Sequence, residues 1–249
     1  METRRWYGDD TLTEFMTLHP LDSALQRVMR ADEHLADIRQ RLAIFIRQHE
    51  NVIISQFNTN RPQDMVTLIP TQIFAPMSIA IRIGEICYNL RTALEYLVFE
   101  LAKLDCGVSQ KKTQFPIEDT AEGFQLRLKR GWLKGLNTNH ITAIERLQPY
   151  QGCGWSRALR DLSNKDKHRE FPALKGRGQV MVYTSNDWQF ASLALPVHRA
   201  LHPVTGKEMD VKVDFQTEVA FDDGTPVVET LVEIKRGVAQ ALADFKLEF

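Results

Sequence analysis

The sequence contains few cysteines and no long hydrophobic run. Its three cysteines are an odd number and form no C-x-x-C pair, which fits a reduced cytosol. The most apolar stretch, 73–81, ends at Arg82, far short of the roughly 20 residues that cross a bilayer. The first ten residues lack the apolar core of a secretory signal. These absences predict a cytoplasmic protein that does not bind a membrane.

An excess of charge of one sign is also missing. The chain has 31 Lys and Arg against 32 Asp and Glu, so it has no global attraction to nucleic acid or anionic lipid. Its 43% hydrophobic and 25% charged residues are typical of a globular protein and exclude a disordered chain, a fibre or a membrane bundle. Locally, 155–177 carries seven Lys and Arg against three Asp and Glu, while 207–233 carries two against eight. An anionic ligand is expected at the first segment, unless both segments are solvated faces.

The motifs of common active sites are missing as well. The glycines form no phosphate-binding loop, and there is no G-x-S-x-G nucleophile elbow. His198 and His202 have the spacing of a zinc-protease helix but lack its glutamate. We therefore predict no cofactor and no metal site.

Two long amphipathic helices dominate the first half of the chain. Apolar residues recur every seven positions from Leu21, which predicts a helix over 21–49. Pro76 suits the first turn of a second helix, because its missing N–H costs nothing there, and Cys106–Gly107 ends that helix. Cys87 within it is expected to be a small buried hydrophobe. One buried stripe is predicted along this second helix, with spacings of 3 and 4: Ile83, Ile86, Leu90, Leu94, Leu97, Leu101 and Leu104.

Shorter elements occupy the middle of the chain. Two β-rich runs, 52–57 and 65–69, are joined by a polar segment and predict a hairpin between the long helices. Breaks at Pro and Gly then delimit three shorter helices, over 120–130, 138–147 and 155–169.

After Gly176 the hydrophobic period changes to two. The runs 180–184 and 189–195 predict strands. In 211–221, Val and Phe alternate with charged residues, which is typical of a half-buried antiparallel strand. The turn 222–226 leads into a last helix whose inward residues are predicted to be Val228, Leu231, Val238, Leu242 and Phe245.

These elements predict an α+β fold. It is a mainly α-helical bundle with a small antiparallel β-sheet inserted before the C-terminal helix. We expect a single domain over 1–249, because no interdomain linker, repeat or low-complexity tract is present. The bundle is formed by 21–175 and 222–249, and the β-rich region 178–221 packs on it.

The densest polar cluster lies at 159–169. Asp166 falls on the helix face that Trp155 and Leu162 mark as buried, so its carboxylate needs a cationic partner. His168 lies off that face. The cluster is either a clamp that ties two helices together, with His168 as a cation at the helix C-terminus, or part of an active site.

The second long helix offers a partner for Asp166. Arg91 and Glu95 lie one turn apart on one flank of its apolar stripe. If the two helices are neighbours, Arg91 is predicted to form a bidentate pair with Asp166, and the alternative is an Arg91–Glu95 pair on a solvated face. The candidate catalytic residues are Arg91, Glu95, Asp166 and His168. The candidate binding residues are Asn89 and Tyr96, on the other flank with Arg82 and Glu85, together with Asn164, Lys167 and Arg169.

Several runs resemble a widespread group of uncharacterised bacterial proteins. The runs are Tyr88–Leu97, Phe115–Ile117, Leu147–Tyr150 and Leu162–Arg169, and the 222–226 turn is also similar. In that group the first run is approximately His-Asn-Leu-Arg-Ser-Ala-Leu-Asp-His-Leu and the fourth contains Asn-Ile-Asp-Lys-His-Arg. The resemblance extends from about Leu21 onward, but it implies no activity.

A more distant resemblance is to HEPN domains, helical bundles that include metal-independent ribonucleases of bacterial defence and toxin systems. Their signature is Arg, a polar residue, and His after four to six intervening residues. Arg91 and Thr92 match its start, but the first histidine position is Tyr96. This resemblance implies ribonuclease activity only if His168 substitutes from the neighbouring helix.

Three classes of function follow. The first and favoured one is a binding or interaction module, with RNA or a protein as partner and a homodimer as an open alternative, in which Arg91, Asp166 and His168 organise the bundle. The second is a HEPN-like ribonuclease with a rearranged site. The third is a hydrolase with Asp166 or Glu95 as the base.

Overall fold

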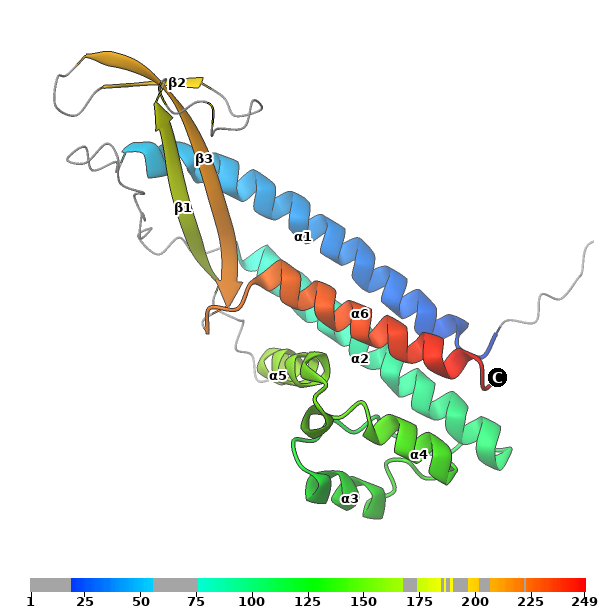
Figure 1. The fold of residues 1–249 in the computed structure, drawn as a ribbon. Coiled ribbons are helices and arrows are strands. Elements are labelled where there is room, and N and C mark those ends of the chain that lie inside the picture. The colour runs from blue at the N-terminus through cyan, green and yellow to red at the C-terminus, as the bar shows by residue number, and fades with distance from the viewer. Residues whose placement is uncertain are drawn as a thin grey trace, which may run out of the picture.

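The protein is a helical bundle with a three-stranded sheet at one end (Figure 1). The computed structural model describes residues 19–55, 76–167, 174–184, 186, 189, 197–201, 207–221 and 223–249. For some of these residues, among them Asp166 and Lys167, it describes the backbone alone. The mainly helical bundle predicted from the sequence is confirmed.

Three long helices form the centre of the bundle. They are α1 (Asp22–Ser55), α2 (Met77–Cys106) and α6 (Val227–Lys246), and each of the three contacts the other two (Figure 1). The short helix α5 (Gly154–Lys167) packs on α2 and α6. The first and last of the described helices therefore lie side by side, and an ion pair between Lys235 and Asp32, 2.5 Å apart, joins them.

Two further short helices and a 3₁₀ turn connect α2 to α5. They are α3 (Ala121–Lys129), α4 (Thr138–Glu145) and η1 (Pro149–Gln151). The side chain of Thr120 accepts a hydrogen bond from the Gly123 N–H at 3.0 Å and begins α3. Asn137 begins α4 in the same way, accepting from the His140 N–H at 2.9 Å. Local side-chain caps thus fix where both helices start.

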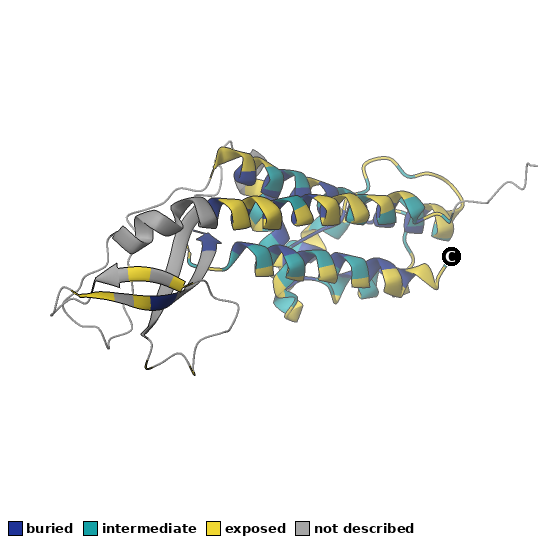
Figure 2. Cartoon of the chain, turned by 90° about the horizontal axis from the view of Figure 1, so that it is seen from above, coloured by how far each residue is buried: buried dark blue, intermediate teal, exposed yellow. Residues whose placement is uncertain are grey.

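The apolar stripe of α2 forms the centre of the core. Its residues from Ile83 to Leu101 are at most 1% exposed, and Cys87 is buried among them, as predicted. Leu104 is 44% exposed, so the prediction that the stripe continues to it is wrong. The reason is that Leu104 lines an open pocket between α2, α4 and α6. Buried residues lie on the inward faces of the long helices and exposed ones on the outside (Figure 2).

The predicted hairpin after α1 is wrong where the structure describes it. Residues 52–55 continue α1 as helix, because nothing in this run of Val and Ile interrupts the helix and β propensity alone is a weak constraint. The rest of the predicted hairpin, including 65–69, lies outside the described residues. Pro76 precedes the first residue of α2 as its N-cap, and Gly107 ends α2 with a left-handed φ of 73°.

The sheet has β3 (Glu208–Phe221) between β1 (Leu174–Thr184) and β2 (Val197–Leu201), with both pairs antiparallel. Of the three predicted strands, 180–184 lies in β1 and 211–221 in β3. The strand predicted over 189–195 differs: Gln189 lies in a 3₁₀ turn, 190–195 is outside the described residues, and β2 begins later.

The inner end of β3 contributes to the bundle core. Val219 and Phe221 belong to the same buried cluster as the helices, and β3 contacts α1 and α6. Val211 is buried as predicted, but Lys212 is only 7% exposed, contrary to its predicted outward placement. β3 is the central strand, so Lys212 has a strand neighbour at each edge. The side chains of Val213 and Phe215 lie outside the description.

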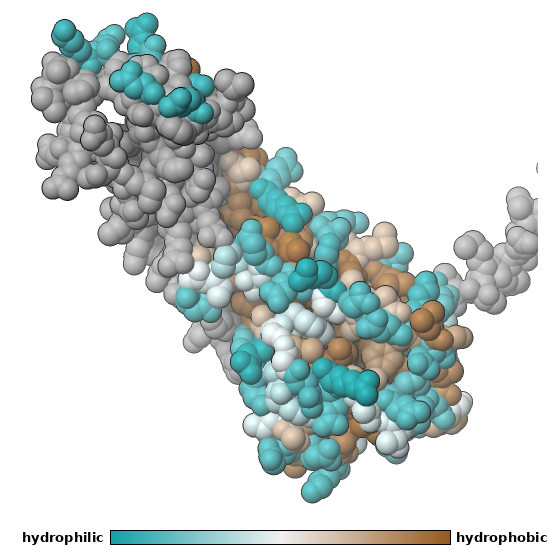
Figure 3. Space-filling model, in the orientation of Figure 1, coloured by the Kyte–Doolittle hydropathy of each residue, from teal (hydrophilic) through white to brown (hydrophobic). Residues whose placement is uncertain are grey.

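The last helix buries one face. Leu231, Val238, Leu242 and Phe245 are buried as predicted, whereas Val228 is half-buried because Val227 takes the inward position in the first turn. Among the described helices, none combines the length and the apolar character that a bilayer crossing requires. On the face seen in Figure 3, hydrophilic and hydrophobic side chains are interleaved over the helices.

Candidate functional site

Arg91 and Glu95 hold the backbone of one residue, Phe115. Glu95 Oε2 accepts a hydrogen bond from the Phe115 N–H at 2.8 Å, and the Arg91 guanidinium donates to the Phe115 carbonyl oxygen. Arg91 Nε also pairs with Glu95 Oε1 at 2.9 Å. Burial lowers the pKa of Arg91, while Glu95 and Glu118 oppose that shift. The two residues satisfy both backbone polar groups of the buried Phe115, which is a structural task.

The segment that follows Phe115 is held by Gln148, which is completely buried. Its Oε1 accepts from the Glu118 N–H at 2.9 Å, and its Nε2 donates to the Pro116 carbonyl at 2.9 Å. The side-chain amide thus forms hydrogen bonds that a neighbouring strand would otherwise provide to this segment. Two runs that carry the resemblance to the bacterial group, Phe115–Ile117 and Leu147–Tyr150, are therefore in direct contact.

The second half of the predicted site begins on α5 with Asn164, Asp166 and Lys167. This helix is a neighbour of α2, as the predicted clamp requires. Asn164 is exposed on α5. The side chains of Asp166 and Lys167, and all of His168 and Arg169, lie outside the described residues. The predicted pairing of Arg91 with Asp166 stays a prediction.

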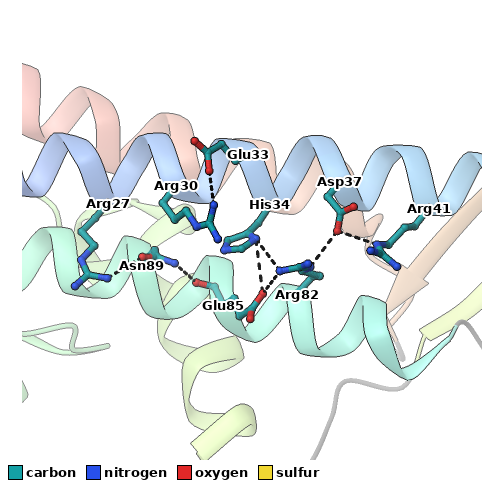
Figure 4. Close-up of polar contacts among 9 residues, drawn as sticks. All are labelled: Arg27, Arg30, Glu33, His34, Asp37, Arg41, Arg82, Glu85 and Asn89. Carbon is teal, nitrogen blue, oxygen red and sulfur yellow. Dashed lines mark hydrogen bonds and ion pairs between the residues drawn. The ribbon is translucent and has the colours of Figure 1, made fainter.

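The other flank of α2 faces α1 and forms a groove of about 530 Å³. Nine charged or polar side chains from the two helices line and extend it (Figure 4). Arg82 from α2 reaches Asp37 on α1 at 3.0 Å and Glu85 at 2.7 Å. Asp37 also accepts from Arg41 at 2.8 Å, and Arg30 pairs with Glu33 at 2.6 Å. Three arginines of the groove therefore have carboxylate partners.

His34 is nearly buried in the middle of this groove, with 6% of its surface exposed. Its Nδ1 lies 3.2 Å from Arg82 Nη1. Since a guanidinium can only donate, Nδ1 accepts and the proton of the neutral ring is on Nε2. Burial lowers the pKa of His34, and the nearby arginines lower it further, while Glu85 opposes them. His34 is thus a neutral donor at physiological pH.

Arg27 differs from the other arginines of the groove. Its Nη1 donates to Asn89 Oδ1 at 3.2 Å, and its guanidinium carbon lies 6.0 and 5.9 Å from the ring centres of Tyr88 and Tyr96. Among the described residues, no carboxylate lies within ion-pair distance of it. Asn89 is itself fixed by donating to the Glu85 carbonyl at 2.8 Å. The printed partners of the Arg27 guanidinium, Asn89 and the two tyrosine rings, are therefore all neutral, and Figure 4 shows its contact with Asn89.

The groove contains only part of the predicted site. Asn89 lines it and Tyr96 lies beside its Arg27, whereas Arg91 and Glu95 lie on the opposite flank of α2. The contribution of α1, with Arg27, Arg30 and His34, was missed by the sequence analysis. Their i, i+3, i+7 spacing on α1 is the signal that marks them as one face.

No protein-family model, no curated protein and no solved structure matches the chain.

Proposed function

We propose that this protein is a binding module whose α1–α2 groove takes single-stranded nucleic acid, with RNA as the first ligand to test. The observation that carries the proposal is Arg27, a guanidinium without a carboxylate partner among the described residues, held beside the ring of Tyr88. An uncompensated cation in a groove attracts a phosphate.

Tyr88 supports a nucleic acid over a simple anion. It is 62% exposed and carries Arg27 near its ring, so much of its surface remains accessible. Aromatic rings beside arginines are the usual platform on which unpaired bases stack. Phosphate contact at Arg27 and base stacking on Tyr88 therefore account for the two unusual residues of the groove together.

Because the chain is nearly neutral, we expect its binding of nucleic acid to be modest and salt-sensitive, without a general electrostatic attraction over the whole surface. The three arginines that are paired with carboxylates add little positive potential to the groove, because their partners offset their charge. Affinity then depends on Arg27 and Tyr88, and it should respond sharply to their replacement.

The test is fluorescence anisotropy with a labelled single-stranded RNA of about twelve nucleotides, long enough for one compact domain. Arg27→Gln and Tyr88→Ala should each weaken binding about tenfold, in line with a lost phosphate contact and a lost stacking contact. Arg39→Gln is the matched control, because Arg39 is exposed on α1 outside the groove. Equal affinity of Arg27→Gln and the unaltered protein would remove the groove as the binding site.

The same samples separate the other functional classes. Gel analysis of the RNA after incubation reports cleavage, and cleavage that His168→Ala abolishes would favour the HEPN-like ribonuclease instead. Absence of any salt-sensitive RNA binding, in a folded sample, would reject the proposal and leave a protein partner as the ligand to seek.

A further inference from the structure

Five exposed cations gather around the end of α3, and we call them the basic patch. They are Lys111, Lys112, Lys129, Arg130 and Lys134. The first two lie in the segment between α2 and α3, the next two are at the C-terminal end of α3, and the last follows it. α3 lies across the bundle from α1, so the basic patch is separate from the α1–α2 groove (Figure 1).

Backbone contacts bring the two segments of the basic patch together. The Gln114 N–H donates to the Trp132 carbonyl at 2.9 Å. A Cβ atom added at Gly135 would lie 2.8 Å from Gln110 Cγ, so the other end of the same segment is also close to the turn after α3. The lysine pair between Gln110 and Gln114 therefore lies beside that turn, and the cations of both segments form one surface.

The acidic residues of this region do not neutralise the basic patch. The carboxylates within 103–137 are those of Asp105, Glu118, Asp119 and Glu122. The first accepts hydrogen bonds from Asn137, the second pairs with Arg127, and the third pairs with two arginines of α5. The fourth lies in the first turn of α3, about two turns from the basic end of the helix. Among the described residues, no carboxylate lies within ion-pair distance of the patch, so its positive charge is uncompensated.

Each half of the basic patch also carries an exposed apolar side chain. Leu126 is 46% exposed and lies one turn before Lys129 and Arg130, so the three share one face of α3. Val108 is 59% exposed and precedes the lysine pair by three residues. A partner that is both anionic and apolar accommodates these side chains together with the cations.

The backbone conformation of Lys112 also indicates a role for its side chain. Its φ is 68°, and it is the one non-glycine residue of the described chain with a positive φ. Glycine adopts this left-handed conformation without strain, whereas lysine rarely adopts it. The loop geometry alone would favour glycine here, so a lysine at this position points to a use for its charge.

We propose that the basic patch binds the surface of an anionic phospholipid bilayer. The cations then contact the lipid headgroups, while Leu126 and Val108 enter the boundary between headgroups and acyl chains. The expectation from the sequence that the protein does not bind a membrane depended on the lack of a spanning segment and of a secretory signal. Attachment to the bilayer surface requires neither of them.

The composition of the basic patch favours a lipid surface over a nucleic acid. Four of its five cations are lysines, whereas the planar guanidinium of arginine is the better ligand for the phosphates of a nucleic acid. The phosphate backbone also offers no apolar layer to Leu126. The proposal is therefore independent of the RNA site proposed for the α1–α2 groove, and either can fail alone.

Cosedimentation of the full chain with vesicles tests the proposal. Vesicles of phosphatidylcholine with about one third phosphatidylserine should bind the protein, and vesicles of phosphatidylcholine alone should not. Added salt should weaken the binding, because it screens the exposed charges. The double variant Lys111→Gln, Lys129→Gln removes one cation from each segment. It should weaken binding about 25-fold, since each basic residue near an anionic surface contributes about fivefold.

Two further variants separate the basic patch from net charge and from charge altogether. Arg39→Gln combined with Lys207→Gln makes the same charge change at exposed positions on α1 and before β3, and it should leave vesicle binding unchanged. Leu126→Ser changes no charge and should weaken vesicle binding about fivefold, because an apolar side chain no longer enters the interface. All the replaced side chains are exposed, so the circular dichroism of each variant should match that of the unaltered protein.

Three results would overturn the proposal. The first is equal vesicle binding by the two double variants, and the second is no preference of the folded protein for the anionic vesicles. The third is a patch variant that keeps vesicle binding but loses affinity for single-stranded RNA, or that dissociates a dimer in size-exclusion chromatography. Such a variant would assign the basic patch to a nucleic acid or to a second copy of this chain.

Discussion

The indole ring of Trp155 on α5 lies directly against the backbone of Gly237 on α6. A Cβ atom added at Gly237 would lie 2.4 Å from the indole carbons Cγ and Cδ2, far inside van der Waals contact. A glycine in a helix interior is unfavourable by itself. Here the missing side chain lets an aromatic ring dock, and α5 is positioned against α6 by this contact.

Gly237→Ala should therefore destabilise the protein, although alanine is the better helix former. Overpacking costs about 1–3 kcal/mol, which exceeds the roughly 1 kcal/mol gain in helix propensity. Urea unfolding gives the free energy. Gly154→Ala is the control, because a Cβ at Gly154 meets no atom within 4 Å. Equal stability of the two variants would mean that Trp155 moves aside freely.

Leu94→Ala should cost about 2–5 kcal/mol, since it removes a fully buried side chain from the centre of the core. Leu104→Ala changes the same residue type on the same helix, at a position that is 44% exposed, and should cost less than about 1 kcal/mol. Reversible unfolding of both variants measures the difference. A loss below about 0.5 kcal/mol at Leu94 would contradict the bundle core.

Glu95→Gln should destabilise the fold by about 1–3 kcal/mol, because it removes the charge that pairs directly with the half-buried Arg91 guanidinium and weakens the hydrogen bond to the Phe115 N–H. Asp119→Asn is the comparison, since Asp119 pairs with Arg157 and Arg160 at the surface. Surface pairs contribute about 0–1 kcal/mol, so its effect should be small. If Glu95→Gln leaves the stability unchanged, Glu95 does not have the structural role described above and is again a candidate catalytic residue.

His34 should make stability depend on pH. Its pKa is lowered in the folded state, so the unfolded chain takes up a proton first as the pH falls. Stability is full above the ordinary histidine value of about 6.5 and decreases from there down to the lowered pKa. His34→Gln keeps an acceptor for Arg82 and should flatten this part of the profile. Denaturation midpoints across the pH range test it, and an equally steep profile in the variant would assign the dependence to other groups.

Limited proteolysis should yield no stable helical fragment that lacks the sheet. Val219 and Phe221 at the inner end of β3 are buried in the same core as the helices, so removal of the sheet exposes that core. Digestion followed by mass spectrometry and circular dichroism gives the answer. A stable, folded fragment ending near Gly176 would demonstrate two independent domains.

The positions that sequence predicted well are those set by local periodicity. Leu90, Leu94 and Leu97 are buried because one helix face must be apolar, and their spacing alone carries that information. Leu104 follows the same spacing and is exposed, because burial at the helix end depends on where α4 and α6 stop. Periodicity predicts which side of a helix is apolar, but it carries no information about how far the neighbouring helices extend.

The partners of the candidate site residues are set by contacts between segments that are distant in the sequence. Arg91 was predicted to pair with Asp166 or with Glu95, and it pairs with Glu95. The carbonyl that it also contacts belongs to Phe115, in a segment whose path no local pattern determines. The partner of Asn89 was missed for the same reason. Arg27 reaches it because of the register between α1 and α2, and register between two helices is set by packing along their whole length.

The packing of α6 on α2 affects when the core forms during synthesis on the ribosome. The core residues of α2 are covered on one side by α6, whose Leu231, Val238 and Leu242 belong to the same buried cluster. A nascent chain that ends before Val227 lacks α6, so the leucine-rich face of α2 stays exposed to other polypeptides. The native core therefore closes only after Val227–Lys246 has left the exit tunnel, and a chain that stalls before this point is prone to aggregate.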